Sequence, residues 1–238
     1  MTGNRKVRVG ESDRRLFMLL LQQKCLSLPL IIKWLAPEDS NLPPGKRSNV
    51  YFRLNRLVRT GYLQKHSLEG HDVYLLSQAG REVVSDLNCH KLPLVTSSDL
   101  ETVSHDLVTA EIRHYLETHG ASGWVSDREL RLHADELPYV PDGACTCAGV
   151  TVFVEVELSR KSRARYDKIA EVYTAPKGPD RVLYFFRDEA VVGYLMGIVG
   201  EHQRIGFFQY KSDMPVPGVV SGVCAAKDMS LSRFLNLL

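Results

Sequence analysis

Two glutamates interrupt an apolar stretch in the second half of the chain. The segment "TVFVEVEL", residues 151–158, is rich in Val and Phe, which predicts a largely buried strand. Because side chains alternate along a strand, Glu155 and Glu157 share one face and the neighbouring valines lie on the other. Asp142 precedes this strand in the segment "PDGACTCAG". Carboxylates in apolar surroundings require a cation, a shared proton or water.

The three carboxylates predict a site for Mg²⁺ or Mn²⁺, because hard cations take oxygen ligands and keep several waters. A bound metal polarises a phosphate and lowers the pKa of a water molecule, which then attacks phosphorus as hydroxide. Basic side chains offset the charge that develops on the phosphoryl oxygens. Lys161, Arg165 and Lys168 follow at helical spacing, which predicts a cationic stripe beside the acids, with the Lys161 ammonium returning to the site. The alternative is that Glu155 and Glu157 face solvent from an edge strand.

Charge is unevenly distributed along a chain of ordinary globular composition. The 238 residues are 44 % hydrophobic and 24 % charged, and the formal net charge is +2. Residues 1–65 hold 13 Lys and Arg against 4 Asp and Glu, whereas residues 66–140 hold 5 against 13. A basic N-terminal third predicts a polyanionic partner for that third. A solvated basic face is the alternative.

Several classes of protein are disfavoured by the composition. No apolar run approaches the roughly 18 residues of a membrane span, and the first residues lack the apolar core of a signal peptide. The five cysteines include no CxxC pair, which argues against a zinc site and favours buried or free thiols. We therefore expect a reduced, cytoplasmic protein that does not enter a membrane.

Helical periodicity and turn residues organise the N-terminal third. Helices are predicted over residues 12–25, 27–35 and 46–60. Ser12 is the predicted N-cap of the first helix, and Gly61 ends the third. Two β segments joined at Glu69 and Gly70 then predict a hairpin, which a further helical segment follows.

Three helices followed by a small hairpin is the order of a winged helix-turn-helix, whose third helix enters the major groove while the wing touches the DNA backbone. The segments "LNRLVRTGYL" and "YLLSQAGRE" resemble winged-helix domains of bacterial regulators and plasmid proteins. The third helix has a basic outer face, and its candidate DNA-binding residues are Lys46, Arg47, Asn49, Arg53 and Arg56. Arg165 and Lys168 extend this set. The alternative is a winged helix that binds another protein.

The rest of the chain predicts an α/β domain. A long helix is followed by three strands, a helix, a strand, a helix and a strand, which implies a sheet with helices on both faces. The first of these strands is predicted within residues 123–133. The next two meet in a turn at Ala148 and Gly149, and a helix over residues 159–175 begins with Ser159 as its N-cap.

This layout of a helix and three strands, with "PD" on the second strand and paired acids on the third, resembles the PD-(D/E)xK nuclease superfamily of restriction-endonuclease-like domains. We therefore divide the chain into a winged-helix domain, residues 1–90, and a PD-(D/E)xK-like α/β domain, residues 91–238. In the superfamily an Asp and a Glu hold a divalent metal, and a third residue two positions after the Glu assists the attacking water. These positions fall on Asp142, Glu155 and Glu157. The usual third residue is Lys, so Glu157 departs from the pattern.

Longer segments narrow the resemblance. "SHDLVTAEIRHYL", "PDG" and "VFVEVELSRKS", in this order, are similar to the plasmid replication-relaxation family, and to MobC-type mobilisation relaxases in particular. The resemblance implies a DNA-processing protein of a mobile element that binds an origin-like site in double-stranded DNA. It would nick or relax that DNA for conjugation or plasmid mobilisation. Other mobilisation proteins and a second copy of the chain, as a homodimer, are the candidate protein partners.

The resemblance also bears on the mechanism. His105 matches a histidine that recurs in the family, which makes it a candidate catalytic residue; a structural histidine is the alternative. Tyr166 and Tyr173 are candidate nucleophiles for a covalent mechanism, but the histidines are scattered, so we prefer metal-activated water. The second hypothesis is a non-catalytic winged-helix DNA-binding regulator with a degenerate nuclease-like domain, which the missing lysine at Glu157 favours.

Overall fold

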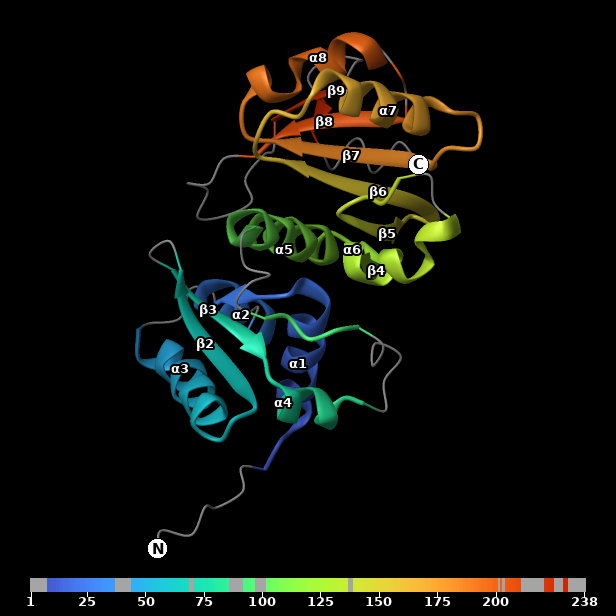
Figure 1. The fold of residues 1–238 in the computed structure, drawn as a ribbon. Coiled ribbons are helices and arrows are strands. Elements are labelled where there is room, and N and C mark those ends of the chain that lie inside the picture. The colour runs from blue at the N-terminus through green and yellow to red at the C-terminus, as the bar shows by residue number, and fades with distance from the viewer. Residues whose placement is uncertain are drawn as a thin grey trace, which may run out of the picture. The chain divides into compact units, whose positions relative to one another are not determined.

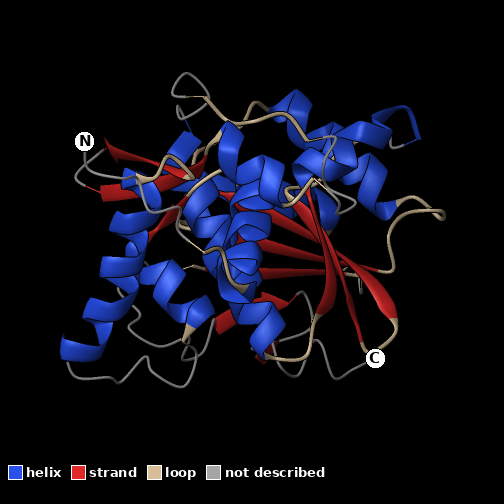
Figure 2. Cartoon of the chain, turned by 90° about the horizontal axis from the view of Figure 1, so that it is seen from below, coloured by secondary structure: helices blue, strands red, loops and turns tan. Residues whose placement is uncertain are grey.

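The chain forms two compact units with mixed α/β structure, divided between His114 and Tyr115 (Figures 1 and 2). The computed structural model describes residues 8–36, 44–68, 71–85, 92–96, 102–136, 139–200, 202, 204–210, 221–224 and 229–230. The division lies inside a helix, whereas the sequence placed a domain boundary between residues 90 and 91. Within the described part of the chain, no helix has the length and apolar character needed to cross a membrane.

Three helices open the first unit, as the sequence predicted. They are α1 (Glu11–Gln23), α2 (Leu28–Leu35) and α3 (Pro44–Arg59). The predicted N-cap of α1 is wrong, because Gly10 occupies the extended cap position and Ser12 lies inside the helix. Asp13, three residues after the cap, accepts a hydrogen bond from the Gly10 N–H at 2.8 Å. An acid in the first turn also interacts favourably with the helix dipole.

Helix α3 buries one of its sides, and Gly61, the glycine that the sequence indicated, terminates it two residues after Arg59. Leu54 and Leu57 are fully buried in the core of the unit. Gly61 has φ +79°, a conformation in which glycine avoids the strain of a Cβ atom. Its N–H donates to the Val58 carbonyl at 3.0 Å, and the Tyr62 N–H donates to the Leu57 carbonyl at 2.9 Å. These two bonds form a Schellman motif, which satisfies the last carbonyls of the helix.

A small antiparallel sheet completes the first unit, in the order β1-β3-β2. Its strands are β1 (Leu26–Ser27), β2 (Leu63–Leu68) and β3 (His71–Leu76). The β2–β3 pairing confirms the predicted hairpin strands, while Glu69 and Gly70 lie outside the described residues. Helix α4 (Gln78–Val83) follows, with the Ser77 hydroxyl accepting the Gly80 N–H at its N-terminus.

A seven-stranded sheet is built by the described residues of the second unit, in the order β10-β9-β8-β7-β6-β5-β4. Its strands are β4 (Ser122–Ser126), β5 (Gly143–Cys147), β6 (Val150–Glu157), β7 (Arg181–Phe186), β8 (Ile205–Gln209), β9 (Ser221–Cys224) and β10 (Met229–Ser230). The helical elements are α5 (Val103–Thr118), which crosses the division, α6 (Asp127–Leu130), the 3-10 helix η4 (Arg131–Glu136), α7 (Arg163–Thr174) and α8 (Glu189–Val199). Strands β4, β5 and β6 are antiparallel, whereas β6, β7 and β8 are parallel.

Two sequence predictions for this unit need correction. The extended segment predicted over residues 123–133 is a strand only as far as Ser126, because Ser126 and Glu129 form a capping box that starts α6. The N-cap of α7 is Ser162, whose hydroxyl accepts the Arg165 N–H, and not Ser159. Lys161 therefore precedes α7, and the predicted three-residue cationic stripe is reduced on the helix to Arg165 and Lys168.

Strand β6 lies inside the sheet, paired with β5 and β7. The turn from β5 has positive φ at Ala148 (48°) and Gly149 (85°), as two-residue hairpin turns require. Glu155 and Glu157 share one face of β6, as predicted, beside β7 residues that pack against α7 and α8. They are 1 % and 2 % exposed, so the alternative of a solvent-facing edge strand is wrong.

Candidate active site

Lys161 returns to the acidic face of β6. Its Nζ lies 2.5 Å from the Oε2 of Glu157, and the lysine side chain is itself mostly buried. The Tyr184 hydroxyl of β7 donates to the same carboxylate oxygen at 3.1 Å. Charge-assisted hydrogen bonds of this kind offset the free-energy cost of burying a carboxylate. A lysine from four residues further along the chain thus supplies a cation at Glu157.

Glu155 is the most deeply buried of the three carboxylates. The Tyr173 hydroxyl of α7 donates a hydrogen bond to its Oε1. Burial raises the pKa of Glu155 to about 8, and the negative charge of Asp142 acts in the same direction. The Tyr173 hydrogen bond and the charge of Lys161 oppose this rise in pKa. Glu155 therefore stays protonated at neutral pH until a cation compensates its charge.

This pKa predicts how stability depends on pH. Unfolded, Glu155 titrates near 4.5, but in the folded protein its pKa is about 8, so its contribution is full below pH 4.5 and is lost as pH rises towards 8. We expect Glu155→Gln to remove that loss, with a difference in slope approaching about 1.4 kcal/mol per pH unit. Urea unfolding in EDTA between pH 5 and 8 measures it. Exposed Glu171→Gln is the control, and parallel curves for wild type and Glu155→Gln would contradict the assignment.

Asp142 is held at the start of β5, next to the acids of β6. Its Oδ2 accepts the N–H of Val156, the residue between the two glutamates, at 2.8 Å, and its charge acts on Glu155. Gly143 follows directly, and a Cβ atom at this position would lie 2.3 Å from the Trp124 ring. The absence of a side chain at Gly143 thus allows Trp124 to pack against the strand that carries Asp142.

The donor set suits a divalent cation held partly by substrate. Among the residues that the structure describes, no three His, Cys, Asp or Glu side chains gather closely enough to hold a metal ion by themselves. Glu157 is bound to Lys161 and Tyr184, whereas Asp142 lies close enough to Glu155 for its charge to raise the pKa of that carboxyl. Mg²⁺ is commonly bound by one or two carboxylates together with water and substrate phosphates. Asp142 and Glu155, whose pKa rises under the charge of Asp142, are two carboxylates of the kind that this requires.

Comparison with known proteins provides no relative from which a role can be transferred: no protein-family model, no curated protein and no solved structure matches the chain.

Tyrosines surround the acids, and two of them were not foreseen from the sequence. Tyr139 hydrogen-bonds to Arg165, and its ring meets that of Tyr173 edge-on at 5.7 Å. Burial, followed by the charges of the neighbouring acids, raises the pKa of Tyr184 and of Tyr139 well above the usual range. The signal for Tyr184 was its alternation in "RVLYFF", which places it on one face of a buried strand.

The two tyrosines considered as nucleophiles have structural partners. Tyr173 is buried and bound to Glu155, and desolvation raises its pKa well above the usual value. The Tyr166 hydroxyl accepts the Lys161 N–H at 3.0 Å, and burial raises its pKa as well. A phenol with a raised pKa is a poor nucleophile, because little of it is ionised. The geometry favours these hydroxyls as supports for the acids and for the loop that carries Lys161.

The histidine predicted to be catalytic belongs to the first unit. His105 lies on α5, with its Nδ1 3.9 Å from an oxygen of Asp106, which is itself paired with Lys24 at 2.9 Å. Glu111, on the same helix, is paired with Lys33 at 2.6 Å. These contacts tie α5 to α1 and α2, which gives this part of α5 a structural role within its unit.

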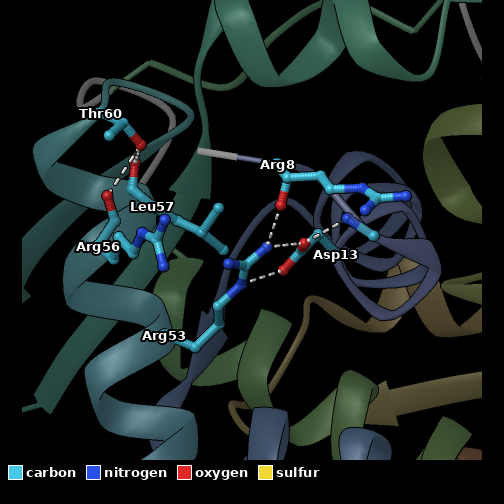
Figure 3. Close-up of polar contacts among 7 residues, drawn as sticks. Arg8, Asp13, Arg53, Arg56, Leu57 and Thr60 are labelled. Atoms are coloured by element: carbon cyan, nitrogen blue, oxygen red, sulfur yellow. Dashed lines mark hydrogen bonds and ion pairs between the residues drawn. The ribbon is translucent and has the colours of Figure 1, made fainter. Parts of the chain in front are cut away.

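Helix α3 separates its predicted DNA-binding residues into two groups. Asn49 and Arg56 are exposed. Arg53 instead binds Asp13 through two hydrogen bonds, one of them from Nε to Oδ1 at 2.7 Å, and its Nη2 donates to the Arg8 carbonyl at 3.0 Å (Figure 3). Asp13 is buried, and this pairing fastens α3 to the start of α1. The side chains of Lys46 and Arg47 lie outside the described part of the chain.

These partners predict different costs for two neighbouring arginines. Arg53→Met leaves the buried Asp13 carboxylate without its cation, so we expect a loss of roughly 2 kcal/mol in the free energy of unfolding. Arg56→Met, at an exposed position on the same helix, should change that free energy by less than about 0.5 kcal/mol. Urea unfolding of both variants measures the difference. Equal losses would show that the Arg53–Asp13 pair does not stabilise the unit.

Proposed function

We propose that the protein is a metal-dependent DNA endonuclease of a mobile element, which binds an origin-like site and nicks it by means of metal-activated water. The observation that carries the proposal is the convergence of Asp142, Glu155, Glu157 and Lys161 at one place on the sheet. The acids come from two neighbouring strands and the lysine from the loop after them. Burial of several ionisable groups does not by itself stabilise a fold, so a buried cluster of this composition favours a functional role.

The topology supports a PD-(D/E)xK assignment for the second unit. A helix, an antiparallel β4-β5-β6 meander, helix α7 and the parallel strand β7 follow one another, with helical residues 127–136 inserted after β4. Asp142 directly precedes the second of these strands and the two glutamates lie on the third, which agrees with the superfamily pattern. Lys161 stands in for the lysine that the pattern places at position 157.

Each side chain has a distinct part in the proposed chemistry. Asp142 and Glu155 would hold Mg²⁺ or Mn²⁺, which when bound supplies Lewis-acid polarisation of the phosphate and a water of lowered pKa. Lys161, kept near the acids by Glu157, provides positive charge for the oxygens that become negative during the reaction. Arg165, hydrogen-bonded to Tyr139, adds a second cation on the exposed side of the acids. Tyr173 and Tyr184 orient the two glutamates.

The first unit is the proposed DNA-binding part, as a winged helix-turn-helix. Support comes from the order of three helices and a hairpin, and from the exposed polar and cationic side chains of α3. In that arrangement α3 would occupy the major groove, and β2 and β3 would form the wing. The basic charge of residues 1–65 favours a nucleic acid over an acidic peptide as the extended ligand.

Incubation of the purified chain with supercoiled plasmid tests the proposal. Open circles are expected with Mg²⁺ or Mn²⁺ and none with EDTA, since hydrolysis depends on the metal. A random duplex library, incubated in Ca²⁺ so that binding is separated from cleavage, identifies the preferred site. Plasmid that remains supercoiled under every metal condition, although the protein binds it, would overturn the catalytic part of the proposal.

A second function is favoured by one specific observation. Position 157 carries Glu in place of Lys, and this Glu neutralises Lys161. If Lys161 cannot act on the phosphate because Glu157 neutralises it, the protein would be a non-catalytic DNA-binding regulator. Its second unit would then have kept the fold and lost the reaction. The two functions differ in a single result, because the regulator shifts plasmid in a gel without breaking it in any metal.

A further inference from the structure

Helix α3 carries two neighbouring aromatic side chains that are exposed to solvent. Phe52 is 67 % exposed and Tyr51 is 42 % exposed, and the centroids of their rings lie 6.2 Å apart. The core contacts of α3 come from its other side, where Leu54 and Leu57 are fully buried. An aromatic side chain left in water forgoes the stabilisation that burial gives, so the exposed Phe52 ring would gain stabilisation by packing against a ligand.

Phe52 belongs to a row of exposed side chains along α3. The row consists of Asn49, Phe52, Arg56 and Arg59, and we call it the α3 stripe. Residues spaced by three and four positions lie on one side of a helix. Arg53, adjacent in sequence, is excluded from the stripe because Asp13 holds it against α1 (Figure 3). The stripe therefore presents one amide, one aromatic ring and two guanidinium groups.

These side-chain types match the exposed edges of DNA bases. In the major groove, Asn pairs with adenine, Arg pairs with guanine, and apolar groups contact the methyl group of thymine. Phe52 is the apolar member of the stripe, and it lies between Asn49 and Arg56 in sequence. Its position would place the ring against a base pair between those that the two polar side chains contact.

We propose that Phe52 is a specificity-determining residue that packs on a thymine methyl group in the major groove. The inference rests on the proposed DNA-binding function of the first unit and goes beyond it, because it names a base and the group on that base that is recognised. Arginine contacts to phosphate cannot supply this discrimination, since phosphates are the same at every position.

A second copy of the chain is a poorer occupant of the same surface. A two-fold interface places the same patch of each copy against the other. The stripe would then bring Arg56 and Arg59 of both copies into one interface, and α3 contains no Asp or Glu to pair with them. DNA brings the complementary charge along its whole length.

Removal of the methyl group from the DNA tests the inference without altering the protein. A preferred duplex is first selected from a random library with the full chain, and each thymine is then replaced by deoxyuridine. We expect about a fourfold loss of wild-type affinity at one or two thymines, the value of one buried methyl group. Phe52→Ala should bind the parent duplex about tenfold more weakly and should not distinguish deoxyuridine from thymidine at those positions.

Two controls separate this contact from general effects. Ile198→Ala removes another exposed hydrophobic side chain and should leave affinity and deoxyuridine sensitivity unchanged. Arg56→Ala, which removes the proposed guanine contact, should weaken binding but keep the deoxyuridine sensitivity of the wild type, whereas Phe52→Ala should lose that sensitivity. The inference is overturned if deoxyuridine has no effect on the wild type, or if Phe52→Ala keeps the same sensitivity. Failure of the wild type to bind any duplex would refute the proposed DNA-binding function itself, together with this inference.

Discussion

Replacing Asp142 with Asn is expected to lower metal-dependent DNA cleavage by about a thousandfold or more, while DNA binding stays unchanged. Loss of a metal ligand removes several kcal/mol of transition-state stabilisation, and about 4 kcal/mol corresponds to a factor of a thousand. Asn keeps an oxygen that can accept the Val156 N–H, so the strand geometry is preserved. Initial rates of plasmid nicking at saturating Mn²⁺, with a gel shift on the same DNA, measure the two effects separately.

The chain offers a closely matched control for this substitution. Asp180 also accepts a backbone N–H from β6, that of Thr151 at 3.1 Å, but at the other end of the strand. Asp180→Asn therefore makes the same chemical change to the same kind of contact, and cleavage should remain within about twofold of wild type. Equal losses of cleavage in the two variants would show that the loss comes from a disturbed strand β6 and not from a missing metal ligand. Full activity of Asp142→Asn would remove Asp142 from the metal site.

Local patterns in the sequence were sufficient to predict the strands and the turn that carry the glutamates of the candidate site. The alternation in "TVFVEVEL" predicted a buried strand with both glutamates on one face, and β6 confirms it. The turn predicted at Ala148 and Gly149 is present between β5 and β6, and both residues have the positive φ of a two-residue hairpin turn. Such features depend on side chains only a few positions apart, so a single sequence contains the information.

Helix starts were predicted less well than helix ends. Ser12 and Ser159 are suitable N-cap residues by type, but each helix begins at another residue close by. An N-cap is decided by which residue has extended backbone and which side chain can reach the free N–H groups of the first turn. For α1 that side chain is Asp13, which belongs to the helix itself.

Contacts between residues far apart in the chain could not be predicted from the sequence. The Arg53–Asp13 pair joins residues 40 positions apart, and Tyr184 reaches Glu157 across 27 positions. Nothing in the local spacing distinguishes an arginine that faces DNA from one that holds a buried acid. The return of Lys161 to Glu157 was suggested by a separation of four residues, but the close contact depends on the loop before α7.

Lys161→Met is expected to be the most destabilising single substitution at the site, with a loss of about 3–5 kcal/mol in the free energy of unfolding. Methionine fills the space of the lysine stem but leaves the Glu157 carboxylate buried with the Tyr184 hydroxyl as its remaining donor. Urea unfolding at pH 7 in EDTA measures the loss. A variant as stable as the wild type would show that Glu157 does not depend on the lysine for its burial.

The double variant Lys161→Met with Glu157→Gln separates stability from catalysis. Removing both charges together should restore most of the lost stability, because a neutral amide can still accept the Tyr184 hydrogen bond and no uncompensated charge stays buried. If Lys161 provides the cation for the reaction, this stable double variant should still cleave at least about a hundredfold more slowly than wild type. Cleavage at the wild-type rate would instead make the pair a purely structural one, and Arg165 would then be the remaining nearby cation to test.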